Sequence, residues 1–121
     1  MGNYGSGYVY TSADLGIWDE DGDLVLRANV PGWYDAPATW REGFWYVAIE
    51  PVELPAGTYR VGIVSWESDA DDYLTFATGS FAEGIAYEAA VYAPGNWLLY
   101  PSNSTQTEGI SFVGPSFLFL R

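Results

Sequence analysis

Two runs of aromatic and β-branched residues, separated by a corner that interrupts regular structure, constrain the fold of this chain most. Residues 44–49 read FWYVAI and residues 59–66 read YRVGIVSW, and both compositions are typical of strands on a packed sheet surface. Between the runs, Pro51, Pro55 and Gly57 break any helix or strand. The stretch therefore predicts two strands joined by an irregular corner.

The corner carries a pattern that occurs in β-sandwiches. Leu54, Gly57 and Tyr59 are spaced as Leu-x-x-Gly-x-Tyr, in which a tyrosine at the start of a strand hydrogen-bonds back across the corner. We expect the Tyr59 hydroxyl to donate to a backbone carbonyl within residues 51–57, which is a structural role. We also expect four residues around the corner to be buried: Leu54, Tyr59, Val61 and Ile63.

A hairpin is predicted nearer the N-terminus. Residues 15–18 and 24–30 flank the acidic turn DEDGD, whose Asp-Gly pair favours a hairpin because glycine tolerates positive φ. Simple alternation along the second strand places three residues on one face: Leu24, Leu26 and Ala28.

Turn signals recur along the rest of the chain at roughly ten-residue spacing. Further strands are predicted at residues 8–11, 73–77, 85–92, 97–100, 110–113 and 116–120, with loops at residues 2–7, 31–42, 67–72 and 101–109. No segment has a convincing helical period. Residues 1–121 are therefore expected to form one all-β domain, a jelly-roll-like antiparallel β-sandwich.

Charge and composition exclude several classes of function. The formal net charge is −12, from 16 acidic residues and 4 arginines, and the chain has no Lys, His or Cys. No basic groove can be built for nucleic acid, and anionic membrane surfaces are disfavoured. No apolar stretch is long enough for membrane insertion. Disulfides and Cys-based metal sites are excluded, so no cofactor is expected apart from a hard cation such as Ca²⁺.

The composition also argues against catalysis. Without His, Cys or Lys, the usual general bases and nucleophiles are missing. The 16 acidic residues are scattered over turns, and no pair stands out as the two carboxylates of a glycoside hydrolase. We therefore expect no enzyme activity and assign no catalytic residue.

Four segments together resemble a known family. They read LGIWDEDGDLVLRANVP, GFWYVAIEPVELPAGTYRVGI, GIAYEAAVY and FVGPSFLFL, within residues 15–120. Their order resembles the β-sandwich domain of bacterial exported proteins that carry a PEP-CTERM sorting tail. In that family a G-I-W-D-x-x-G-x-L hairpin precedes G-F-x-Y-V and L-x-A-G-x-Y-x-x-G strands and a closing G-P-x-F-x-F. The resemblance implies a non-catalytic extracellular module with a structural or adhesive role.

Two features differ from the family pattern. A longer connection usually precedes the family's GIWD hairpin, whereas residues 12–14 leave only a tight one here. Residues 2–6 lack the charged start and apolar core of a signal peptide. A secreted or cell-surface location is therefore an expectation that rests on the resemblance alone.

The acidic hairpin turn is a candidate Ca²⁺ site. Asp19, Asp21 and Asp23, with Glu20, crowd carboxylate oxygens, the ligands that Ca²⁺ prefers, into one turn. The spacing is not that of an EF-hand, because Gly is fourth rather than sixth in the run. The alternative is a solvated Asp-Gly hairpin without a metal.

Aromatic residues in or beside predicted loops form a second candidate site. Trp33, Tyr34, Trp40 and Trp97 could stack on sugar rings or anchor a protein partner. The alternative is that their rings cap the ends of a small sandwich core.

Residues 1–11 are a candidate arm for assembly. Tyr8, Val9 and Tyr10 have strand propensity, and with Tyr4 they could pair with the open sheet edge of a neighbouring subunit. Repetition of such a contact gives a fibre when its rotation does not close. The alternative is an ordinary edge strand within the monomer.

The sequence thus predicts a non-catalytic secreted or cell-surface structural module, a subunit of an extracellular assembly or filament. Its partners would be copies of itself or another surface protein. The alternative is a carbohydrate-binding module that uses the loop Trp and Tyr residues, with or without Ca²⁺.

Overall fold

Antiparallel strands make up the regular structure of this chain. The computed structural model describes residues 2–4, 12–31, 38–42, 44–64, 73–75, 83–86, 88–89, 91–95, 97–104 and 110–112. These residues hold ten strands and no helix: β1 (Gly2–Tyr4), β2 (Ala13–Trp18), β3 (Leu24–Val30), β4 (Thr39–Arg41), β5 (Phe44–Tyr46), β6 (Arg60–Ile63), β7 (Tyr73–Thr75), β8 (Val91–Tyr92), β9 (Asn103–Ser104) and β10 (Ile110–Phe112). The predicted all-β class is confirmed. Within the described ranges, no helix is long and apolar enough to cross a membrane.

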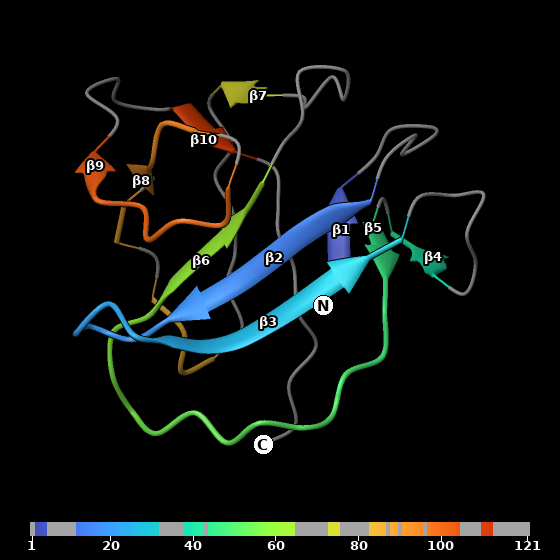
Figure 1. Ribbon diagram of the computed structural model, residues 1–121, viewed down its shortest axis with the longest axis horizontal. Helices are drawn as coiled ribbons and strands as arrows, with labels where there is room; N and C mark the ends of the chain where they lie inside the picture. Colours follow the sequence, from blue (N-terminus) through green and yellow to red (C-terminus); the bar gives the residue numbers. More distant parts are fainter. Residues whose placement is uncertain are drawn as a thin grey trace.

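The longest strands form a three-stranded sheet in the order β3-β2-β6, which crosses the centre of Figure 1. The predicted hairpin is confirmed, because β2 and β3 pair in antiparallel register on either side of the acidic turn. Gly22 in that turn has a φ of 87°, a conformation that glycine adopts without strain. The strand β2 begins at Ala13, so the predicted connection at residues 12–14 is wrong: Asp14 is part of the sheet.

The hydrophobic core lies against one face of this sheet. Leu15 and Ile17 of β2 and Ala28 and Val30 of β3 form its buried centre. Half-buried side chains from other segments pack against them: Val25, Leu26, Ala38, Trp45, Val47, Leu54, Tyr59, Val61 and Ile63. Burial of these apolar groups is the main stabilising term of the fold.

A β-bulge changes the predicted faces of β3. Ile17 pairs with Leu26 but Trp18 pairs with Leu24, so Val25 is an extra residue on β3. Beyond the bulge the alternation changes phase, and both Val25 and Leu26 pack against the core. Leu24 does not share the face of Ala28 and is 47% exposed. The prediction for Leu24 is therefore wrong.

The opposite face of β2 is closed at one end by Trp18. This side chain is 4% exposed and lies across the two glycines of the neighbouring register pair, Gly16 of β2 and Gly62 of β6. A β-carbon at Gly16 would lie 2.8 Å from Cη2 of Trp18, and one at Gly62 would lie 3.0 Å from Cζ3. The indole fits because both positions lack a side chain.

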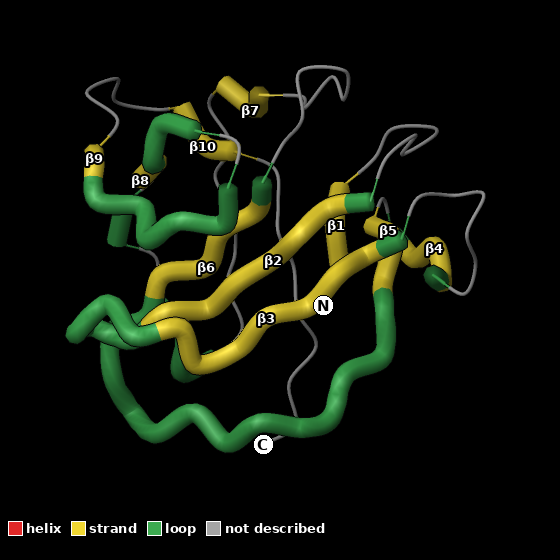
Figure 2. The backbone as a smooth tube through the Cα atoms, in the orientation of Figure 1, coloured by secondary structure: helices red, strands yellow, loops and turns green. Residues whose placement is uncertain are grey.

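A second sheet has the order β1-β5-β4. Residues 44–46 form its central strand, a shorter one than the predicted 44–49. Its outer strands, β1 and β4, pair with β5 on opposite sides. Both lie in segments that the sequence predicted to be loops, residues 2–7 and 31–42. From β5, residues 47–59 run past β3 and return to β6 (Figure 2).

The hydrogen bond predicted for the tyrosine corner forms within this return segment, at an exposed rather than a buried position. The Tyr59 hydroxyl donates a hydrogen bond to the Pro55 carbonyl over 2.8 Å. Leu54, Tyr59, Val61 and Ile63 all pack against the core, but they are half-buried rather than buried, which corrects the predicted burial. They lie at the margin of the core, where β6 is an outer strand of its sheet.

The C-terminal half differs most from the sequence prediction. Among the described residues of the expected strand 85–92, only β8 is strand; residues 85, 86, 88 and 89 are irregular and follow a turn at residues 83–84, where Gly84 has a φ of 89°. Residues 97–100 form a loop rather than a strand, and the expected loop at 101–109 contains β9, which pairs with β8. The strands predicted at residues 73–77 and 110–113 are confirmed over residues 73–75 (β7) and 110–112 (β10), and these two strands pair with each other. The expectations for residues 8–11, 67–72 and 116–120 lie outside the described residues.

The contact between Trp18 and Gly16 leads to a stability prediction. Gly16→Ala should lower the free energy of unfolding by about 1–3 kcal/mol, because the new methyl overlaps a rigid, buried indole. Gly57→Ala is the matched control: its β-carbon would meet Tyr59 at an ordinary 3.7 Å, and the change should stay within about 1 kcal/mol. Urea unfolding measures both, and equal effects of the two substitutions would contradict the role of Trp18.

Candidate functional site

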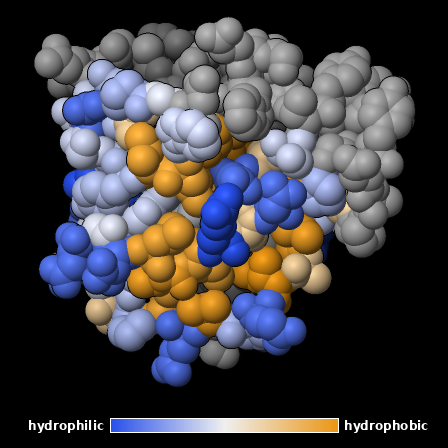
Figure 3. Space-filling model, viewed as in Figure 1, coloured by the Kyte–Doolittle hydropathy of each residue, from blue (hydrophilic) through white to orange (hydrophobic). Residues whose placement is uncertain are grey.

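A groove of about 360 Å³ opens on the face of the β3-β2-β6 sheet opposite the core. Apolar residues gather on this face around strongly hydrophilic side chains (Figure 3). The groove takes residues from β2, β3, the end of β6 and the loop after β8: Ser12, Asp14, Arg27, Asn29, Val64, Trp97 and Leu98.

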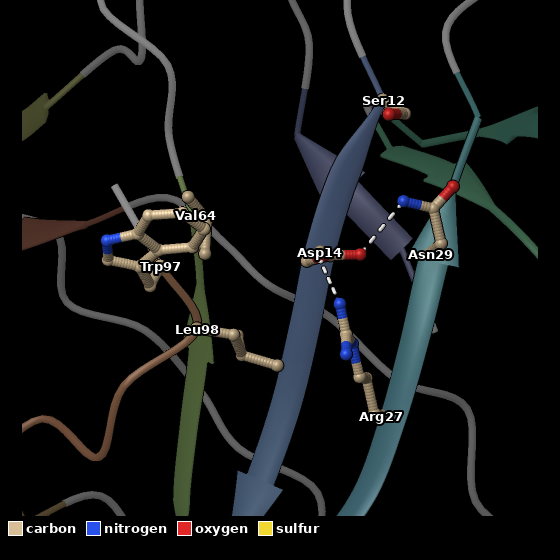
Figure 4. Close-up of a pocket in the computed structure, with 7 residues that line it drawn as sticks. All are labelled: Ser12, Asp14, Arg27, Asn29, Val64, Trp97 and Leu98. Carbon is tan, nitrogen blue, oxygen red and sulfur yellow. Dashed lines mark hydrogen bonds and ion pairs between the residues drawn. The ribbon is translucent and has the colours of Figure 1, made fainter. Parts of the chain in front are cut away.

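One wall of the groove is a polar trio built by strand register. Asp14 of β2 lies directly opposite Asn29 of β3, and Arg27 is its diagonal neighbour on the same face. The Asp14 carboxylate accepts from Asn29 Nδ2 through Oδ1 at 2.9 Å and from Arg27 Nη2 through Oδ2 at 2.6 Å. Figure 4 shows both donors pointing at Asp14 across the gap between the two strands.

The trio favours the ionised form of Asp14. The hydrogen bond from Asn29, together with the hydrogen bond and the charge of Arg27, lowers the pKa of Asp14, against the partial burial that raises it. Asp14 is therefore a fixed carboxylate acceptor at neutral pH, beside amide and guanidinium donors.

The other wall of the groove carries an exposed indole. Trp97 is 77% exposed, and with Leu98 it comes from the loop between β8 and β9 (Figure 4). Val64, which is buried, lines the groove at the end of β6 and donates its backbone N–H to the Asp14 carbonyl over 2.9 Å. This bond continues the β2–β6 pairing by one residue and joins the two walls through the backbone.

The loop that bears Trp97 is fixed to the sheet through Tyr100, three residues after Trp97. The Arg60 guanidinium lies 4.4 Å from the Tyr100 ring centroid, a cation–π contact. Tyr100 also meets Trp18 edge-to-face, with ring centroids 6.5 Å apart. Arg60 donates a further hydrogen bond to the carbonyl of Pro101, which is buried. These contacts hold the loop over β6 and place Trp97 beside the groove.

The structure separates the aromatic residues that the sequence grouped together. Trp97 lines the groove, whereas Trp40 is 55% exposed on β4 of the other sheet. Trp33 and Tyr34 lie outside the described residues. Of the residues named for assembly, Tyr4 belongs to β1, which pairs with β5 of the same chain. Tyr8, Val9 and Tyr10 lie outside the described residues.

The candidate Ca²⁺ residues form a tight turn. Oδ1 of Asp19 accepts two backbone hydrogen bonds, from the N–H of Asp21 at 3.1 Å and of Asp23 at 2.9 Å. One carboxylate of the candidate set therefore already satisfies the backbone of the hairpin. Within the described part of the chain, no group of three or more acidic residues has the geometry of a metal site. Binding of Ca²⁺ by Asp19, Asp21 and Asp23 stays a prediction.

Sequence reasoning missed the polar trio. Arg27 and Asn29 are two residues apart on β3, so alternation puts both on the face opposite Ala28, and this is a usable signal in the sequence. Asp14 was assigned to a connection, so its position opposite Asn29 in the sheet was not foreseen. No family model, curated protein or solved structure matches this chain.

The lowered pKa of Asp14 predicts a pH-dependent contribution to stability. The folded-state pKa lies below the ordinary value of 3.8, so the trio stabilises the fold fully above that pH. The contribution is lost as the pH falls through the folded-state pKa. Asp14→Asn should therefore lower the Tm at neutral pH, and its difference from wild type should shrink as the pH falls from about 4 to about 2. Thermal unfolding followed by circular dichroism measures this, and a constant difference would contradict it.

Proposed function

We propose that this chain is a non-catalytic module of a secreted or cell-surface protein and that it binds saccharide in the groove beside Trp97. One observation supports this function: a polar trio and an exposed indole form opposite walls of one groove. Asp14, Arg27 and Asn29 offer acceptors and donors to hydroxyl groups, while the face of the indole can stack on the apolar face of a sugar ring. Binding sites of this kind combine apolar surface with a few fixed polar groups.

The architecture that fits this proposal is the jelly-roll-like antiparallel sandwich. Two observations support it. Trp45 of β5 and Val47 pack against the core face of the β3-β2-β6 sheet, as facing layers do. The tyrosine corner at Tyr59 is a further feature of β-sandwiches. The resemblance to PEP-CTERM-type exported domains agrees with this architecture and is the basis for the proposed location.

Substitution of the groove indole tests the proposed function. Trp97→Ala should weaken saccharide binding by about tenfold or more, because truncation of a central aromatic anchor commonly costs about 2 kcal/mol. Trp40→Ala is the matched control, since it removes an exposed indole from the other sheet. Affinity electrophoresis against hydroxyethylcellulose, soluble starch, xylan and pectin measures both variants. Loss of binding in both variants, or in neither, would contradict the proposed site.

A structural role in an extracellular assembly or filament is the second candidate. One observation favours it: β1 has only three residues and joins β5 by main-chain pairing, which the same strand of a neighbouring copy can supply equally well.

Removal of the N-terminal strand tests the assembly role. If the chain has this role, the intact chain forms oligomers or filaments in negative-stain microscopy. A variant that lacks residues 1–10 should remain monomeric and folded, because the hairpin and its core lie outside the deleted segment. A monomeric intact chain would exclude this role.

A further inference from the structure

We infer that the groove selects neutral over acidic saccharides; this rests on the proposed function and specifies its ligand class. Three features of the molecule favour a neutral ligand. They are the paired charges inside the groove, the hydrogen-bonding capacity of Asp14, and the charge of the whole chain.

The charges that line the groove cancel. Among the lining residues, Asp14 and Arg27 are the charged ones, and they form an ion pair at 2.6 Å. An acidic sugar would have to share the Arg27 guanidinium with Asp14 and bring its own carboxylate or sulfate close to the Asp14 carboxylate. Like charges at such short range repel each other, and partial removal of water strengthens that repulsion. The pair is therefore unsuited to recognition of an anion.

Hydroxyl groups match the trio where anionic groups do not. An ionised carboxylate only accepts hydrogen bonds, and its two oxygens have more acceptor sites than the single bonds from Asn29 and Arg27 use. A sugar hydroxyl can donate to Asp14 and accept from Arg27 or Asn29 at the same time. A carboxylate or sulfate has no proton to donate. Neighbouring hydroxyls on a neutral ring are thus the complementary partner.

The electrostatic field of the whole chain also favours a neutral ligand over an acidic one. The net charge of −12 repels polyanions before they reach the groove, within a screening length of about 8 Å at physiological ionic strength. A neutral saccharide does not experience this repulsion. Trp97 adds contact area that is independent of charge. Affinity for a neutral chain should therefore depend little on salt.

Titration calorimetry with four hexasaccharides tests the inference on the intact chain. Cellohexaose, laminarihexaose and mannohexaose are neutral, and hexagalacturonate carries a carboxylate on each ring. At least one neutral hexamer should bind at least about tenfold more tightly than hexagalacturonate, and its affinity should change less than about twofold between low and high salt. Any binding of hexagalacturonate should strengthen as salt is added.

Asp14→Asn separates the two ligand classes further. Replacement of the carboxylate should weaken binding of the neutral hexamer, because one acceptor oxygen becomes an amide donor, and should strengthen binding of hexagalacturonate, because the repulsion is lost. Glu20→Gln is the control, since it removes one negative charge from an exposed position in the hairpin turn and should change neither affinity. The salt dependence of the unmodified chain gives a second measurement should Asp14→Asn fail to fold.

The outcomes distinguish this inference from the proposed function. Tighter binding of hexagalacturonate at the Trp97 groove would overturn the neutral selectivity and leave saccharide binding intact. Absence of binding to all four hexamers would overturn both. An equal loss of both ligand classes in Asp14→Asn would also overturn the selectivity.

Discussion

The burial of β2 on both faces is the constraint on which the rest of the structure depends. On one face Leu15 and Ile17 belong to the core cluster, and on the other Trp18 covers the glycine pair Gly16 and Gly62. A strand covered on both sides cannot slip by one residue, because a slip would place Asp14 in the core and Leu15 in the groove. The register that stabilises the fold is therefore the register that places Asp14 opposite Asn29.

The packing of Trp18 and the position of the groove are linked through the loop after β8. The Tyr100 ring packs edge-to-face with Trp18 and lies under the Arg60 guanidinium. The loop is therefore held at the end of the sheet where Trp18 packs over Gly16 and Gly62. Trp97 is three residues away in sequence and is itself free of the core, with most of its surface exposed. The loop backbone is thus held in place while the Trp97 ring stays exposed, so a ligand that stacks on this ring would have little of the loop to order.

Sequence reasoning was accurate where structure is local and failed where it depends on distant partners. The Asp-Gly hairpin and the Tyr59 corner are each set within a few residues, and both were predicted. The bulge at Val25 belongs to the pairing of β3 with β2, which alternation along β3 alone does not contain, so that alternation gave the wrong face for Leu24. Residues 97–100 have strand composition but form a loop, and Tyr100 in it contacts Arg60 and Trp18, which are distant in sequence. Trp97 was predicted as a contact residue from its own composition and loop position. Asp14, Arg27 and Asn29 were missed because they come from distant parts of the sequence.

The charge of the chain bears on the choice between binding and assembly. Each copy carries a net charge of −12, and a homopolymer would have to bring such copies into close contact. The repulsion falls off over a screening length of about 8 Å at physiological ionic strength, so neighbouring subunits would feel it at their interface. Strand exchange through β1 supplies only a few main-chain hydrogen bonds to offset it, each with a net value of about 1 kcal/mol. Binding of a neutral saccharide, as proposed for the groove whose own charges cancel, would incur no such repulsion, and this difference supports the proposed binding role over the proposed assembly role.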